Sequence, residues 1–125
     1  MKKISSWMIL IFLSAAVFSC RYDNEDELYG DAICDTSNVA YTNIVKPILT
    51  TNCLGCHSSS SAATFGSGIK LEEHSDLMVQ VNNGNLAGVI THSPGYPAMP
   101  RGGAKLDDCS IEKIMTWINS GAPNN

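Results

Sequence analysis

The stretch Cys53-Leu54-Gly55-Cys56-His57 decides how the rest of this sequence is interpreted. It is a C-x-x-C-H motif, the pattern by which a c-type haem is attached covalently. The two thiols can add to the two vinyl groups of one porphyrin, and the adjacent imidazole can then reach the iron as proximal ligand. The motif therefore predicts one covalent haem, with Cys53 and Cys56 as attachment points and His57 as a metal ligand.

A bare C-x-x-C also occurs as a disulfide, as a redox-active pair and as half of a zinc site. The redox-active pair is typical of a thioredoxin-like βαβ context, which this chain lacks. The zinc site requires two further ligands at compact spacing, whereas His74 and His92 are scattered along the sequence. The motif alone leaves these alternatives open, and the export signal described below favours haem.

A second iron ligand is available in Tyr96-Pro97-Ala98-Met99-Pro100-Arg101-Gly102-Gly103. Prolines on both sides of Met99 stiffen the backbone, and the glycine pair lets the loop turn closely over a flat ring. A thioether suits a redox-active haem iron, and combined Met and His ligation raises the reduction potential. Met78 and Met115 lie in helix-like segments and are interpreted as core residues. We therefore predict Met99 as the distal ligand.

Residues 1–19 are predicted to be a signal peptide. Two lysines are followed by an apolar run from Trp7 to Phe18 and then by small residues. The run is about a dozen residues, shorter than the roughly 20 that a transmembrane helix needs. Val17-Phe18-Ser19-Cys20 resembles a bacterial lipobox, which predicts lipidation of Cys20, although Phe18 is bulkier than the usual residue. An ordinary soluble signal peptide beside a chance cysteine is the alternative.

The segment after Cys20 is predicted to be a solvated tether. All twelve acidic residues of the chain lie after Cys20, and five of them fall between Arg21 and Asp31. Such a charged stretch with few apolar residues cannot form a packed core. We therefore divide the chain into a signal peptide (1–19), a lipid-anchored acidic tether (20–33) and one domain (34–125). We expect the protein in the bacterial cell envelope, anchored to a membrane and facing the periplasm or the cell surface.

The composition is that of a small globular protein. The chain has 125 residues, of which 44% are hydrophobic and 16% charged, with a formal net charge of −4. This length allows one domain once the export signal is removed. Eight basic residues against twelve acidic ones leave no basic stripe, so nucleic acid is not an expected partner.

From about Tyr41 to Asn125 the chain resembles the small class I cytochrome c family. The matching pieces are Pro47-Ile48-Leu49 before the C-x-x-C-H motif, Met99-Pro100 with its glycines, Lys105-Leu106 and Trp117-Ile118. The resemblance implies an all-α fold of about three to five helices around one covalent haem, with the first and last helices crossing beside it. It also implies that Cys53 and Cys56 attach the haem and that His57 and Met99 are its axial ligands. Arg101 departs from the family, whose loops often carry a second proline there.

Apolar periodicity predicts the helices. A first helix begins near Thr42 or Asn43, because Pro47 is tolerated only near a first turn, and it ends near Asn52. Two short helices flank Asn82-Asn83-Gly84-Asn85, and their apolar side chains are expected to wall the porphyrin: Leu77, Met78, Val81, Leu86, Val89 and Ile90. A last helix starts at a cap formed by Asp107 or Asp108 and ends at Gly121. The serine- and glycine-rich stretch 58–68 is predicted to be a flexible loop.

The remaining cysteines and polar side chains also need roles. An oxidising compartment favours a disulfide between Cys34 and Cys109, with two unpaired buried thiols as the alternative. We expect His92 at the polar rim, near a haem propionate, and His74 as a solvated residue at a helix start. Arg101 is a candidate partner of a propionate, since guanidinium suits planar carboxylates.

Three classes of function are compatible with these features. The first is a single-haem electron carrier, in which two protein ligands on the iron leave only outer-sphere transfer at the haem edge. Its partners would be redox proteins or a larger respiratory complex. The second is a haem enzyme, which needs an open iron position or a second haem, whereas the chain has one C-x-x-C-H motif. The third is an accessory or sensor subunit of a membrane-bound redox complex.

Overall fold

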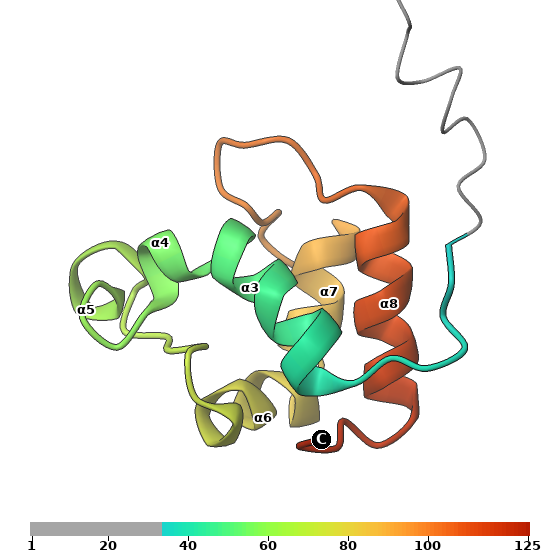
Figure 1. Ribbon diagram of the computed structural model, residues 1–125. Helices are drawn as coiled ribbons and strands as arrows, with labels where there is room; N and C mark the ends of the chain where they lie inside the picture. Colours follow the sequence, from blue (N-terminus) through green and yellow to red (C-terminus); the bar gives the residue numbers. More distant parts are fainter. Residues whose placement is uncertain (1–33) are drawn as a thin grey trace, which may run out of the picture. The chain divides into compact units, whose positions relative to one another are not determined.

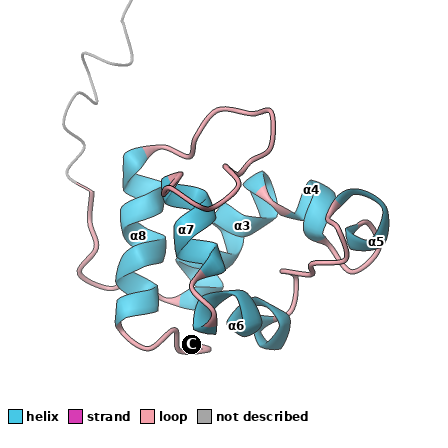
Figure 2. Cartoon of the chain, turned by 180° about the vertical axis from the view of Figure 1, so that it is seen from behind, coloured by secondary structure: helices cyan, strands magenta, loops and turns pink. Residues whose placement is uncertain are grey.

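A computed structural model of the chain describes residues 34–125. The predicted signal peptide and tether, and with them the predicted lipidation site Cys20, lie outside the described residues. All regular secondary structure within 34–125 is helical, which confirms the predicted all-α class (Figure 1 and Figure 2). The elements in chain order are η2 (Tyr41–Val45), α3 (Lys46–Asn52), α4 (Leu54–His57), α5 (Ala62–Phe65), α6 (His74–Asn82), α7 (Asn85–Thr91) and α8 (Asp108–Asn119).

The first helix begins at Tyr41 as one π-helical turn and continues as α3 to Asn52, the predicted end. Pro47 lies in the first turn of α3 and has no N–H to donate. The wider turn of η2, in which the amide of Val45 donates to Ala40 O, precedes this proline and accommodates its ring. The helix therefore begins at Tyr41, just before the start at Thr42 or Asn43 that was predicted from Pro47.

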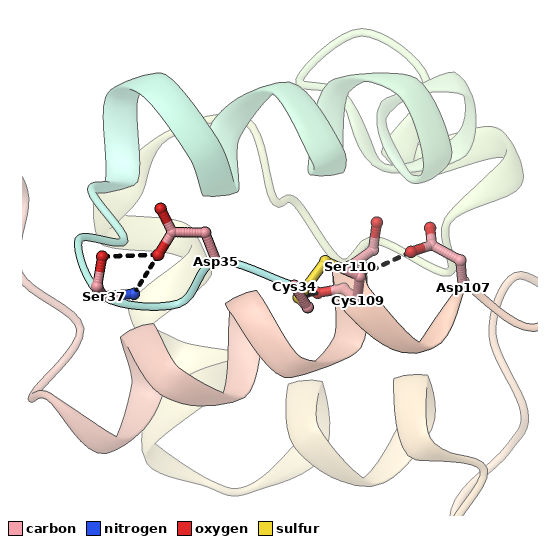
Figure 3. Close-up of a disulfide and its surroundings, with 6 residues drawn as sticks. All are labelled: Cys34, Asp35, Ser37, Asp107, Cys109 and Ser110. Carbon is pink, nitrogen blue, oxygen red and sulfur yellow. Dashed lines mark hydrogen bonds between the residues drawn. A yellow bond between two sulfur atoms is a disulfide. The ribbon is translucent and has the colours of Figure 1, made fainter. Parts of the chain in front are cut away.

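The later helices follow the sequence signals closely. Helices α6 and α7 are separated at Gly84, whose φ of 76° is accessible to glycine without strain. At the start of α8, the Asp107 carboxylate accepts a hydrogen bond from the Ser110 amide at 2.8 Å (Figure 3). Beyond the other end of α8, Gly121 adopts a φ of 95°. Both the cap and the terminating glycine of the last helix are confirmed.

The core lies between η2–α3, α7 and α8. Val45, Leu49, Ile114 and Trp117 are fully or almost fully buried, and Tyr41 stacks on Trp117 with ring centroids 5.5 Å apart. Burying each such side chain contributes roughly 1.5–3 kcal/mol of hydrophobic free energy. Trp117 lies at the centre of this core. Helix η2 packs against α8.

The two ends of the described chain are both fastened to this core. The sulfur atoms of Cys34 and Cys109 lie 2.12 Å apart, at the distance of a disulfide bond, so residues before the first helix join the first turn of α8 (Figure 3). At the other end, the amide of Thr42 donates to Asn125 O at 2.8 Å, and the Trp117 indole donates to Pro123 O at 2.9 Å.

The prediction of a flexible loop at residues 58–68 was wrong in part. Residues Ala62–Phe65 form a helical turn, α5, with Ala62 fully buried. The segment also folds back on α4, because the Leu71 amide donates to His57 O at 2.9 Å and the Ser59 amide donates to Glu72 Oε2 at 2.7 Å. Serine and glycine content indicated a loop, but these long-range hydrogen bonds fix its path. In both views, α4 and α5 extend away from α8 (Figure 1 and Figure 2).

Candidate functional site

The C-x-x-C-H motif occupies the junction between α3 and α4. Cys53 is the residue between the two helices, and the amides of Cys56 and His57 both donate to its carbonyl, at 3.1 and 2.9 Å. Cys53 is half-buried against the core, whereas Cys56 is exposed. The two thiols and the imidazole therefore lie on five consecutive residues, Cys53 to His57, around a single helical turn. The motif therefore presents its three functional groups together.

The two thiols of the motif are both free. Burial raises the pKa of the Cys53 thiol to about 11, so this group stays protonated at neutral pH. A redox-active C-x-x-C pair instead needs a cysteine whose pKa is depressed, because the thiolate is the nucleophile. Cys53 is therefore not the nucleophile of such a pair.

The imidazole of His57 is oriented by a backbone carbonyl. Its Nδ1 lies 2.9 Å from Ile69 O. A carbonyl oxygen only accepts hydrogen bonds, so Nδ1 carries a hydrogen, and the neutral form of this ring has its lone pair on Nε2. Histidines that bind metals almost always donate their second ring N–H to such an acceptor, which fixes the tautomer and the ring plane. His57 thus has the hydrogen bonding of a metal ligand with Nε2 as the donor atom.

Gly66 makes this arrangement of His57 possible. A Cβ atom at Gly66 would lie 2.6 Å from Cys56 O and 2.8 Å from His57 Nδ1, closer than real Cβ contacts. Only glycine lets the returning segment pass this close to the imidazole. The sequence analysis did not identify Gly66, since it lies among several small residues with no spacing that singles it out.

Met99 lies in the segment between α7 and α8, which arches over one end of the domain (Figure 1). Its side chain is half-buried. Its amide donates to Val89 O at 3.1 Å, and its carbonyl lies 2.9 Å from His92 Nε2. Met99 is therefore attached through its backbone to the end of α7, on a different element from the C-x-x-C-H motif.

Apolar side chains near these elements divide into two groups. Leu77, Leu86 and Ile90, which were expected to wall a porphyrin, are covered by the protein itself. Their neighbours Met78, Val81 and Val89 are only partly buried. Between His57 and Leu71, Phe65 is 70% exposed and Ile69 is 37% exposed. Phe65 and Ile69 thus expose apolar surface in the segment that follows the motif, and the porphyrin wall stays a prediction.

Two histidine predictions changed with the structure. His74 begins α6 as expected, but it is not a solvated residue: its Nε2 bonds to Ala122 O at 3.0 Å, and its ring contacts Tyr41 edge-on. His92 bonds to the carbonyl of Met99, which gives it a defined partner in the protein. Arg101 is exposed, and its pairing with a propionate stays a prediction.

Comparison with protein-family models, curated proteins and solved structures gave no match to this chain. Within residues 34–125, no group of three or more His, Cys, Asp or Glu side chains is arranged to hold a metal ion. A haem iron does not need such a group, because one imidazole and one thioether complete its axial coordination. In the same part of the chain, no helix has the length and apolar character required to cross a membrane.

Proposed function

We propose that this protein is an exported, single-haem c-type cytochrome that carries electrons. The observation that supports this most strongly is the geometry of His57 within its C-x-x-C-H motif. The Nδ1 proton is bonded to Ile69 O, which leaves Nε2 as the free donor atom next to two free thiols. This hydrogen bond and the close approach of Gly66 hold the imidazole in one orientation, as is usual for a histidine that binds a metal.

Each functional residue has a separate task in this proposal. Cys53 and Cys56 supply the sulfur atoms of two thioether bonds, each formed when a thiol adds across a vinyl group. His57 Nε2 and the Met99 thioether would bind the iron. The haem, when bound, would supply the one-electron couple of its iron. Two protein ligands on the iron would leave no position for a substrate, so the chain would serve as an electron carrier by outer-sphere transfer at the haem edge.

The proposed location is the bacterial cell envelope, with a lipid anchor at Cys20 after removal of residues 1–19. The Cys34–Cys109 pair supports export, because disulfides persist in oxidising compartments. Redox proteins or a larger respiratory complex are the proposed partners. Purification from native membranes distinguishes a free carrier from an accessory or sensor subunit, since only the subunit would stay associated with the complex.

The test is expression with the full signal sequence in a host that matures c-type cytochromes. The wild-type protein should retain haem stain on a denaturing gel, and its oxidised spectrum should show the weak thioether band at roughly 695 nm. The double variant Cys53→Ala/Cys56→Ala should lose the stain, whereas the matched control Gly55→Ala, where a Cβ meets nothing within 4 Å, should keep it. Full-length, haem-stained protein from the double variant would refute the assignment.

Ligand variants test the two axial positions. His57→Ala should prevent stable maturation. Met99→Ala should abolish the red-edge band and allow carbon monoxide to bind rapidly to the reduced protein. Rapid binding of carbon monoxide to the reduced wild type would show an open iron position, and it would favour the enzyme or sensor classes instead.

A further inference from the structure

His92 adopts a backbone conformation that usually belongs to glycine. It ends α7 with φ 57° and ψ 41°, and the following amide, that of Ser93, donates to Gly88 O at 3.0 Å. This six-residue closure of a helix end commonly has glycine at the left-handed position, since a side chain there is strained. The left-handed conformation of His92 therefore calls for a look at what its side chain contacts.

The side chain of His92 is directed to the predicted distal ligand. Its Nε2 lies 2.9 Å from Met99 O, and because a carbonyl only accepts, Nε2 is the protonated nitrogen. The Met99 amide donates to Val89 O at 3.1 Å, so both backbone polar groups of Met99 are bonded to the end of α7. The left-handed turn at His92 brings its imidazole back over the segment that carries Met99.

A third contact joins the segment that carries Met99 to α7. The ring of Tyr96 lies so close to Gly88 of α7 that a Cβ atom at Gly88 would overlap the ring. Tyr96 and Met99 are thus both attached to α7, on either side of Pro97. Contacts within the protein therefore hold the segment from Tyr96 to Met99 against α7.

We propose that His92 is a positioning residue that holds the Met99 thioether in place for the iron, an inference that rests on the proposed function. His92 acts through the Met99 carbonyl and not as a ligand itself, because its Nε2 is already engaged. The hydrogen bond limits the excursions of Met99 away from its bound position. Its loss should therefore raise the rate at which the sixth iron position opens, without changing haem attachment.

The test variant is His92→Gly, since glycine removes the imidazole and also relieves the backbone strain at φ 57°. In the matured protein we expect carbon monoxide to bind to the reduced form about three- to tenfold faster than in wild type, the factor expected for one lost hydrogen bond. Hydrogen exchange of the Met99 amide should accelerate by a similar factor. The reduction potential should fall, although less than in Met99→Ala.

His74→Ala is the matched control. His74 also bonds through Nε2 to a backbone carbonyl, at 3.0 Å, but far from Met99 in sequence. It should lower the denaturation midpoint and leave the carbon monoxide rate, the Met99 amide and the red-edge band unchanged.

The possible results separate the two proposals. A wild-type protein with the thioether band and a His92→Gly variant that matches it in all three readouts would overturn the role of His92 alone. A wild type that lacks the band, while His92→Gly opens the iron completely, would make His92 the ligand and overturn the positioning role. Absence of covalent haem in the wild type would refute the proposed function and this inference together.

Discussion

Helices η2, α7 and α8 share a core in which Val45, Ile114 and Trp117 have no exposed surface, whereas α4 contains no buried residue. The segment from Cys53 to Leu71, here called the motif arm, buries only Ala62 and Leu71 among its apolar side chains, and hydrogen bonds of His57 to Ile69 and Leu71 fix its path. Its largest apolar side chain, Phe65, is 70% exposed. The two regions thus depend on different forces, although they are adjacent in sequence.

This difference separates a region stabilised by apolar burial from one in which hydrogen bonds orient a side chain. Apolar burial between η2 and α8 is non-directional and tolerates small adjustments. The hydrogen bonds of the motif arm are directional and fix one imidazole. The proposed haem would cover part of the apolar surface that Phe65 and Ile69 expose. The predictions below test this contrast, in order of expected effect.

The largest effect is expected in the core. Trp117→Ala should lower the free energy of unfolding by about 3–5 kcal/mol, because it leaves a cavity beside Tyr41 and removes the hydrogen bond to Pro123. Phe65→Ala in the motif arm of haem-free protein should change it by about 0.5 kcal/mol or less. Urea unfolding followed by circular dichroism measures both. Equal losses would mean that the arm has a core of its own.

The disulfide should have the next largest effect. Cys34→Ser/Cys109→Ser opens a loop with a sequence separation of 75 residues, and removing such a link lowers stability by about 2–4 kcal/mol. Haem staining should be unchanged, since the motif arm lies elsewhere. Peptide mapping of wild type without reductant should recover the two segments linked. Labelling of both cysteines as free thiols in exported protein would contradict the prediction.

Gly66→Ala should act within the motif arm. The new methyl group would collide with Cys56 O and His57 Nδ1, at a cost of about 1–3 kcal/mol, and it should displace the imidazole. Urea unfolding measures the loss of stability. A lower yield of haem-stained protein would report the displacement of the imidazole. Gly55→Ala is the control within the same motif, and it should be neutral or slightly stabilising because alanine favours helices. Identical behaviour of the two variants would show that Gly66 is not required for the geometry of His57.

A smaller effect, which depends on pH, is expected at the cap of α8. Hydrogen bonds from the Ser110 side chain and amide lower the pKa of Asp107 below its ordinary value, as the close-up in Figure 3 illustrates for the amide. The stabilisation is therefore present above the ordinary carboxyl pKa and is lost as the pH falls through the lowered one. Asp107→Ala should cost about 1 kcal/mol near neutral pH.

The matched carboxylate in the motif arm is Glu72, which accepts from Ser59 and whose pKa is also lowered by that bond. It is solvated, so Glu72→Gln should have a smaller effect than Asp107→Ala. Denaturation midpoints recorded from neutral to acidic pH compare the two variants. A pH-independent difference between Asp107→Ala and wild type would exclude the ionised cap.

The sequence predicted the elements whose signals are local. The cap of α8 at Asp107, the break at Gly84 and the helix end at Asn52 each depend on a few neighbouring residues. The C-x-x-C-H motif is also local, so its position on one helical turn was predictable. The position of Trp117 at the centre of the core was not predictable. Apolar periodicity shows which face of a helix is buried, but not how deeply each residue on that face is buried.

The features that were missed depend on contacts between distant segments. Gly66 matters only because its segment returns to His57, and His74 is packed only because Ala122 and Tyr41 meet it. The partner of His92 depends likewise on how the segment after α7 turns back. Such contacts leave no periodic signal in one sequence, so the backbone partners of His74 and His92 could not be predicted.

The bond between Cys34 and Cys109 also determines how the domain bears mechanical load. A pull exerted through the chain that precedes Cys34, such as a membrane anchor would exert, passes directly into the first turn of α8 (Figure 3). This covalent path bypasses residues 35–40. A load applied before Cys34 would therefore not act on the first helix through the chain that leads into it. Tension on the attachment is therefore borne by the longest helix of the described chain, remote from His57 along the sequence.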